Sequence, residues 1–149
     1  MTENNEITIR EIFYSSEEYK EVLRVRDEVL RKPLGMSLYD ENLDGDKTDI
    51  HIAAFDGEII VGVLLLKPVN KSEVKMRQVA VLETYQSRKT GTKLVYFAEK
   101  LAKSLGYTKI ILHAREVAVG FYLKLGYIKS GDEFTEIGIP HYKMMKVLE

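Results

Sequence analysis

The sequence predicts an α/β domain of the α+β kind, in which helices flank a mixed, mostly antiparallel central sheet. Three observations predict this class. Apolar segments of strand length alternate with segments whose apolar residues recur at helical spacing. Asp56-Gly57 joins two apolar runs, which is typical of an antiparallel hairpin. The predicted elements follow in the order β-α-β-β-β-α-β-α-β-β, which fits a sheet covered by helices.

The composition predicts one domain that spans residues 1–149. The chain has 149 residues, 45% of them hydrophobic, and a net charge of −1. This is an ordinary globular composition, and the charge argues against a large surface for nucleic acid. There is no cysteine, which excludes disulfides and a cysteine nucleophile and fits a cytoplasmic protein. We expect no leader peptide, membrane span or metal site, because no sequence signal for any of them is present.

The first third of the chain predicts a strand, a helix and an acidic loop. Residues 6–14 alternate between apolar and polar, as strands do. A helix follows from Ser16 and ends near Pro33 and Gly35. Its apolar stripe contains Tyr19, Val22, Leu23, Val29 and Leu30, and Arg26 lies within the same stripe. Residues 39–49 are predicted to form an acidic loop.

The remainder of the chain predicts a hairpin, two helices and four further strands. The hairpin comprises 51–55 and 58–67, and another strand covers 74–82. A helix at 90–105 ends at Gly106, and its predicted apolar face contains Leu94, Phe97, Ala98, Leu101 and Leu105. A buried strand at 109–113 precedes a short helix at 117–125. The final strands are predicted at 127–130 and 141–147.

A polar turn between the strand at 74–82 and the helix at 90–105 has the features of a phosphate site. The first backbone N–H groups of a helix lack intrahelical partners and lie at the positive end of its dipole, so they bind anions. Arg88 and Lys89 add positive charge, and Gly91 permits close backbone approach. The alternative is a solvated basic helix start, which is common.

Two motifs resemble those of the GNAT acyltransferase superfamily. The turn at 86–91, QSRKTG, is similar to the coenzyme A pyrophosphate loop Q/R-x-x-G-x-G/A. Gln86 and Gly91 match this loop, whereas Lys89 replaces its first glycine, a change that bears on how tightly the loop closes. The segment from Ala118 to Tyr127 is similar to the second signature of the superfamily, A-x-x-F-Y-x-x-L-G-Y.

The resemblance implies a GNAT-type fold and acetyl-CoA as the co-substrate. The pantetheine arm would pair with the backbone of the strand at 74–82, like an added strand. No metal is implied. The residues expected to bind the cofactor are Val79, Ala80, Val81, Gln86, Ser87, Arg88, Lys89, Thr90, Gly91, Thr92, Ala118 and Phe121.

The resemblance also implies direct acyl transfer with two proton tasks. Tyr122 matches the usual general acid of the family, and we expect it to protonate the leaving thiolate; the alternative is a tyrosine packed beneath its helix. His141 is the candidate base, because a histidine accepts protons at neutral pH. Glu83 is the rival base, acting through a water molecule. We expect His113 and His51 to be structural.

A narrower resemblance, to the glyphosate N-acetyltransferase-like branch, covers residues 77–126 and the later Ile139-Pro140-His141. It implies that His141 is the base and that Arg31, Arg77 and Arg115 hold an anionic substrate. The helical pattern independently points Arg26 inward, where it would form either a structural ion pair or a substrate clamp.

The sequence therefore predicts transfer of an acetyl group to the amine of a small molecule, such as an amino acid-like acceptor with an anionic group. Two alternatives remain open. One is a protein or peptide N-acetyltransferase, for which the acidic loop at 39–49 would attract a basic peptide. The other is a non-catalytic acyl-CoA-binding module, which the Lys89 substitution keeps open. The resemblance is compatible with a homodimer.

Overall fold

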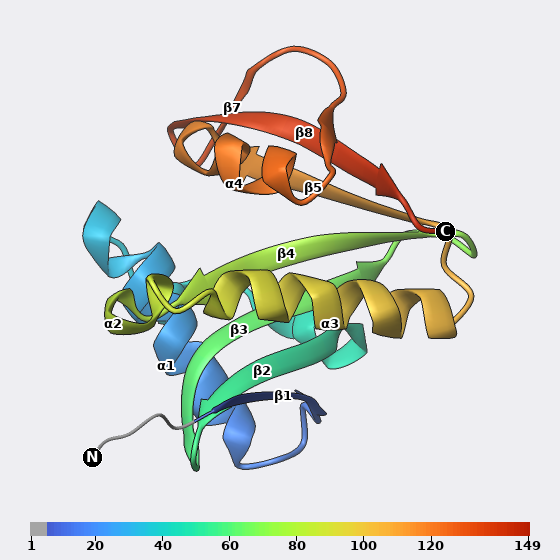
Figure 1. Ribbon diagram of the computed structural model, residues 1–149. Coiled ribbons are helices and arrows are strands. Elements are labelled where there is room, and N and C mark those ends of the chain that lie inside the picture. Colours follow the sequence, from blue (N-terminus) through green and yellow to red (C-terminus); the bar gives the residue numbers. More distant parts are fainter. Residues whose placement is uncertain (1–5) are drawn as a thin grey trace. The chain divides into compact units, whose positions relative to one another are not determined.

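The computed structural model describes residues 6–149 (Figure 1). Its backbone contacts group into two compact units. The first comprises the chain up to Lys67 together with Gln78–Ala98, and the second comprises Pro68–Arg77 together with Glu99–Glu149. Strand β4 (Glu73–Val81) and helix α3 (Thr90–Ser104) each contribute residues to both units. The expectation of a single domain stays a prediction.

The first unit contains an antiparallel β-meander with helices against it. Strand β1 (Ile7–Ile12) pairs with β2 (Ile50–Asp56), which pairs with β3 (Ile59–Pro68) through the predicted turn at Gly57. Helix α1 (Glu18–Leu30) follows β1, and the short helix α2 (Glu83–Gln86) follows β4. The predicted acidic loop contains short 3-10 turns at Leu38–Asp40 and Asp44–Thr48.

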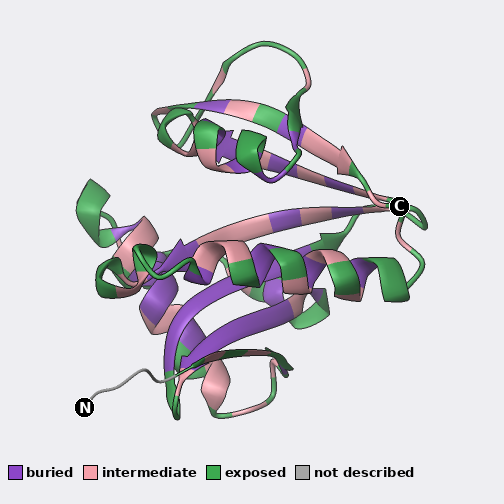
Figure 2. Ribbon diagram, in the orientation of Figure 1, coloured by how far each residue is buried: buried purple, intermediate pink, exposed green. Residues whose placement is uncertain are grey.

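Strands β2 and β3 are buried along nearly their whole length because both faces of this sheet are covered (Figure 2). Val22 and Val25 of α1 pack against Val63 of β3 in one core cluster. Side chains alternate along a strand, so Gly62 faces the opposite way, where a Cβ would lie 3.0 Å from Leu94 of α3. Gly62 thus lets α3 approach the sheet closely.

The second unit contains the parallel pair of the sheet. Strands β4 and β5 (Lys109–Arg115) are parallel, and β8 (Ile139–Val147) runs antiparallel to β5. A 3-10 turn (Glu116–Ala118) and helix α4 (Val119–Lys124) follow β5. Two short strands, β6 (Ile128–Lys129) and β7 (Phe134–Glu136), both pair with β8. The sequence did not predict β7, because three residues are too few to show a period of two.

The structure corrects two expectations about the core. Strand β5 is buried on one face only: Ile110, Leu112 and Ala114 are buried, whereas the residues between them are partly exposed. Leu105 is 53% exposed, and it lies just beyond α3, which ends at Ser104. Within residues 6–149, no helix has the length and apolarity that crossing a membrane requires.

Candidate functional site

The turn before α3 has the backbone geometry of a glycine-containing loop. Lys89 replaces the glycine of the motif and adopts φ 59°, the left-handed conformation that glycine enters most readily. The loop therefore keeps its shape with a lysine in place, and the strain is accepted locally. The guanidinium of Arg88 lies 4.9 Å from the centre of the Tyr85 ring.

The first residue of α3 leaves a buried hydroxyl without a partner. Thr90 is fully buried, and its Oγ1 makes no hydrogen bond. The first bond along the helix runs from Lys93 N to Lys89 O at 3.0 Å, so the N–H groups of the first turn point out of the helix. The amides of the first turn of this 15-residue helix suit the oxygens of a pyrophosphate.

Gln86 supports this turn through its side chain. Its Nε2 donates to the carbonyl oxygen of Val81, the last residue of β4, at 3.0 Å. The bond joins the last residue of α2 to the end of β4 and fixes the path from strand to helix. The rival base Glu83 lies in the first turn of α2, where its side chain is exposed.

Two of the predicted substrate arginines form ion pairs within the first unit. Arg26 is 2% exposed, and its Nη1 donates to Asp46 Oδ2 at 2.7 Å. The inward direction predicted for Arg26 is correct, and its ion-pair alternative is the one observed. Arg31 pairs with Glu41 through Nε at 2.5 Å. A direct role for either arginine in substrate binding stays a prediction.

Tyr122 lies in the second unit, buried within α4. Its ring packs edge-on against Phe121 at 5.0 Å and Tyr127 at 5.7 Å between centroids. Burial raises the pKa of the Tyr122 phenol above its ordinary value. The group therefore keeps its proton at physiological pH, as a general acid requires.

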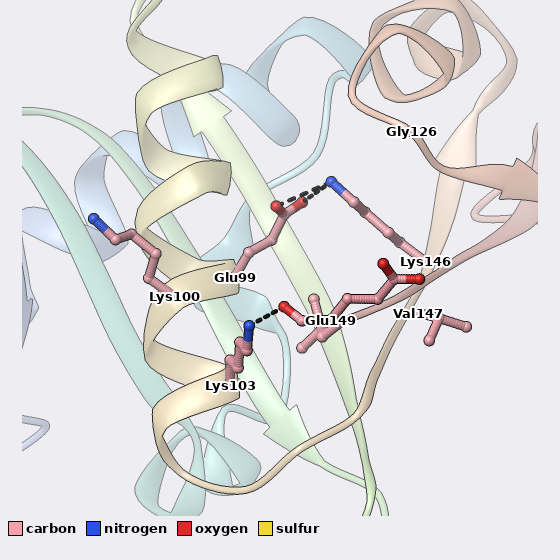
Figure 3. Close-up of a pocket in the computed structure, with 8 residues that line it drawn as sticks. Glu99, Lys100, Lys103, Gly126, Lys146, Val147 and Glu149 are labelled. Atoms are coloured by element: carbon pink, nitrogen blue, oxygen red, sulfur yellow. Dashed lines mark hydrogen bonds and ion pairs between the residues drawn. The ribbon is translucent and has the colours of Figure 1, made fainter.

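The glycine and tyrosine that end the second signature have a structural role. Gly126 adopts φ 95°, and the Tyr127 hydroxyl donates to Glu99 of α3 at 2.9 Å. Lys146 of β8 also binds Glu99, at 3.1 Å (Figure 3). These residues tie α3 to β8 beside a hollow of about 540 Å³. The predicted site residues do not line this hollow.

One face of the sheet in the second unit gathers positive side chains. Arg115 of β5 lies directly opposite His141 of β8, and His113 lies opposite Lys143. Opposed residues of antiparallel strands share a face. Lys75 of β4 joins this face, because its Nζ lies 3.3 Å from His113 Nδ1. Side-chain alternation along β4 places Arg77 on the same side as Lys75.

His141 is held in a defined orientation on this face. It is 3% exposed, and its Nδ1 donates to the carbonyl oxygen of Ile139 at 2.8 Å. A carbonyl oxygen only accepts hydrogen bonds, so Nδ1 carries the proton and Nε2 has the lone pair. That nitrogen lies 3.9 Å from Glu136 Oε2. The geometry fits a base that accepts a proton at Nε2.

Glu136 is a site residue that the sequence analysis missed. It lies at the end of β7, the strand that was not predicted, and its Oε1 accepts a hydrogen bond from His113 Nδ1 at 2.9 Å. His113 was expected at the edge of the core; its side chain is 27% exposed and faces this carboxylate. The short Phe134–Glu136 alternation before Gly138 is the only sequence signal.

The predicted residues thus divide between the two units. The turn expected to bind the cofactor, Arg26 and Arg31 belong to the first unit. The expected acid, the expected base and the remaining arginines belong to the second unit, where β5 and β8 bring Arg115 and His141 together.

Comparison with known sequences gives a family match over most of the chain. The family described as "Acetyltransferase (GNAT) domain" matches residues 14–148. The N-acetyltransferase YjcF of Bacillus subtilis, itself uncharacterized, is 33% identical over 133 residues, which cover 89% of this chain and 94% of that protein.

Solved structures share the fold. A crystal structure from Lactobacillus plantarum, described as that of an N-acetyltransferase, superposes with a TM-score of 0.87 at 21% identity. The match covers 97% of this chain and 100% of that chain. An aminoglycoside 6'-N-acetyltransferase crystallised with coenzyme A gives a TM-score of 0.74 at 19% identity, over 95% and 97% of the two chains. The predicted α/β class, with helices flanking a mostly antiparallel sheet, is confirmed.

Proposed function

This chain belongs to the GNAT acetyltransferase family and is an acetyl-CoA-dependent N-acetyltransferase, and we propose that its acceptor is a small amine that also carries an anionic group. The finer assignment, to the glyphosate N-acetyltransferase-like branch, belongs to this proposal. An amino acid or an amino acid derivative has the required chemistry.

The observation that carries the proposal is the positive face around His141. Arg115 is its cross-strand neighbour, and Lys75 and Lys143 lie along the same face. Arginine binds a carboxylate or phosphonate bidentately through its planar guanidinium. We therefore assign the anion of the acceptor to Arg115, on the strand that pairs with β8, and to Arg77, on the same face of β4, the next strand of the sheet.

The donor side of the proposal rests on the turn before α3. The first-turn amides and the Arg88 and Lys89 side chains would hold the pyrophosphate. The edge of β4 at Val79 and Val81 would bind the pantetheine arm, and Ala118 and Phe121 would line its thioester end. Bound acetyl-CoA supplies an activated acyl group and a thiolate leaving group.

Two side chains would handle the protons. His141 Nε2 takes a proton from the ammonium of the acceptor, which then attacks as the neutral amine. The Tyr122 phenol, which keeps its proton because burial raises its pKa, gives that proton to the departing thiolate. The buried surroundings of both groups exclude water from the transfer.

The acceptor class separates this protein from its aminoglycoside-acetylating structural neighbour. Aminoglycosides are polycations, and a face that gathers arginine and lysine side chains repels them. The same repulsion disfavours a basic peptide at this face.

A panel of acceptors tests the proposal. We expect thiol release from acetyl-CoA with amino acid-like amines that carry a carboxylate or phosphonate, and none with polyamines or aminoglycosides. Arg115→Gln should raise the acceptor KM by about 10- to 100-fold, because one charge-assisted contact is worth about 1.5–3 kcal/mol. The KM for acetyl-CoA should not change.

Two further variants test the proton roles. Tyr122→Phe and His141→Ala should each lower kcat by about 10²- to 10⁴-fold with little change in acetyl-CoA affinity. Turnover confined to polycationic amines would overturn the anionic acceptor, and unchanged kinetics in either variant would remove that residue from the mechanism.

A further inference from the structure

His141 is a buried group that must exchange a proton with water in each catalytic cycle. Its side chain is 4% exposed, and Nδ1 is already bound to Ile139 O. A proton taken up at Nε2 therefore needs both a counter-charge and a path to solvent. A carboxylate lies close by: Glu136 Oε2 is 3.9 Å from Nε2, and the Glu136 side chain is 46% exposed.

Glu136 and the two imidazoles beside it form one packed cluster. His113 Nδ1 donates to its Oε1 at 2.9 Å, and the Phe134 ring packs against the imidazoles of His113 at 4.9 Å and His141 at 6.0 Å. The β7–β8 register places Glu136 opposite Ile139, whose carbonyl orients His141. One hairpin thus positions the base and the carboxylate together.

The turn of this hairpin is strained. Ile137 and Gly138 have φ 47° and 73°, as a two-residue type I′ turn requires. A β-branched residue in the left-handed region is a genuine outlier. Such strain persists only where the surrounding structure enforces it, and it is frequent at functional sites.

The charges around this hairpin keep Glu136 ionised. Burial by itself would raise the pKa of Glu136, but the hydrogen bond from His113 and the charges of His113, His141 and Lys75 together lower it. Arg115 faces His141 from β5, and Lys143 faces His113 from β8. Among these cations, the carboxylate is the group that favours a protonated His141.

We propose that Glu136 is a positioning residue for His141, stabilising its protonated ring and passing that proton to bulk water. The inference rests on the proposed function of His141 as the base. The ammonium of the acceptor loses a proton to Nε2, and His141 becomes positively charged. A small rotation then brings Glu136 Oε2 within hydrogen-bond distance, the Nε2–H bond breaks as an O–H bond forms, and the carboxyl group releases the proton to water.

The decisive measurement is an NMR titration of the His141 imidazole in the ligand-free protein, which does not require turnover. Glu136→Gln removes the charge but keeps an oxygen for His113. It should lower the midpoint of the His141 titration by about one pH unit or more, because an opposite charge within 4–6 Å has an effect of this size. Glu133→Gln is the matched control: this exposed carboxylate lies directly before β7 and should shift the midpoint far less.

The kinetics should follow the titration. In Glu136→Gln the acid limb of the kcat/KM profile should move to lower pH, and kcat at neutral pH should fall by roughly 3- to 10-fold because the base is weaker. Glu136→Asp, which keeps the charge, should restore part of both effects. An unchanged titration in Glu136→Gln overturns the inference whatever the activity, as does a shifted titration with an unchanged pH-rate profile. Absence of acetyl transfer to every anionic amine would instead overturn the proposed function and leave the titration result standing.

Discussion

The buried ion pair between Arg26 and Asp46 shows how an inward arginine is neutralised in this fold. An arginine in an apolar stripe must find an anion, and the predicted acidic loop supplies it from a 3-10 turn. The same Asp46 oxygen accepts from the Tyr19 hydroxyl at 2.5 Å. His51 Nε2 lies 2.8 Å from the Asp46 backbone oxygen, which completes a compact polar network.

We expect Asp46→Ala to destabilise the protein by about 3–5 kcal/mol, because it leaves the Arg26 charge buried without its partner. Urea unfolding measures the loss. Glu21→Ala is the control, since its partner Arg24 is 41% exposed and such surface pairs contribute about 0.5 kcal/mol or less. If Arg26 instead served the acceptor, Arg26→Gln would raise the acceptor KM while stability stayed constant.

At the scale of elements, the described residues include three non-glycine residues with left-handed backbone, one inside a strand and two in turns. Gln78 within β4 has φ 55°, Lys89 before α3 has φ 59°, and Ile137 between β7 and β8 has φ 47°. Each of these positions adjoins a predicted site residue or Glu136. Backbone strain of this kind costs stability, which surrounding contacts must offset.

Lys89→Gly should stabilise the protein by about 0.5–1 kcal/mol. Relief of the left-handed strain, about 1–2 kcal/mol, exceeds the added chain entropy of glycine. Urea unfolding with an unchanged m-value checks the prediction. The control Lys100→Gly, at an exposed position within α3, should destabilise by about 1 kcal/mol. Loss of stability in Lys89→Gly would show that the lysine side chain stabilises the turn by more than its backbone strain costs.

At the scale of the whole molecule, burial of tyrosine hydroxyls couples stability to pH. Burial raises the pKa of Tyr19, Tyr122 and Tyr127, and hydrogen bonds to Asp46 and Glu99 add to the rise for Tyr19 and Tyr127. Tyr19 belongs to the first unit and the other two belong to the second. Both units therefore carry a phenol that resists ionisation.

These shifts predict alkaline destabilisation. In the unfolded chain the phenols lose their protons near pH 10, whereas in the folded protein they keep them. These tyrosines therefore do not change the free energy of unfolding below about pH 10. Above that pH the free energy of unfolding falls by up to about 1.4 kcal/mol per pH unit for each tyrosine. Urea unfolding at pH values from about 8 to about 11, which bracket the ordinary tyrosine pKa of about 10, measures this loss of stability. Tyrosinate absorbance is a second probe. A free energy of unfolding that does not change over this pH range would contradict the prediction. In Tyr122→Phe, the fall of that free energy with pH should be smaller by the contribution of one tyrosine.

Long periodic elements were predictable from the sequence, and so was the position of the turn before α3. Helix α3, the β2–β3 hairpin and the turn that contains Lys89 were predictable from hydrophobic periodicity and turn residues within short segments. The predicted helix at 117–125 is observed as a 3-10 turn followed by α4. Glu136 and strand β7 did not follow, because a three-residue strand is defined by its partner β8 rather than by its own residues. Arg26 was ambiguous for the same reason, since its anion lies 20 residues away.

The conformation of Lys89 also bears on how distant relatives of this protein would be found. A search pattern that demands glycine at that place would discard this chain, although its backbone turns as the pattern intends. The feature that such loops share is then a positive φ at this position rather than a glycine residue. A pattern written to admit lysine, asparagine or aspartate there would recover members that glycine-based signatures omit, and Lys89 is the residue that argues for writing it so.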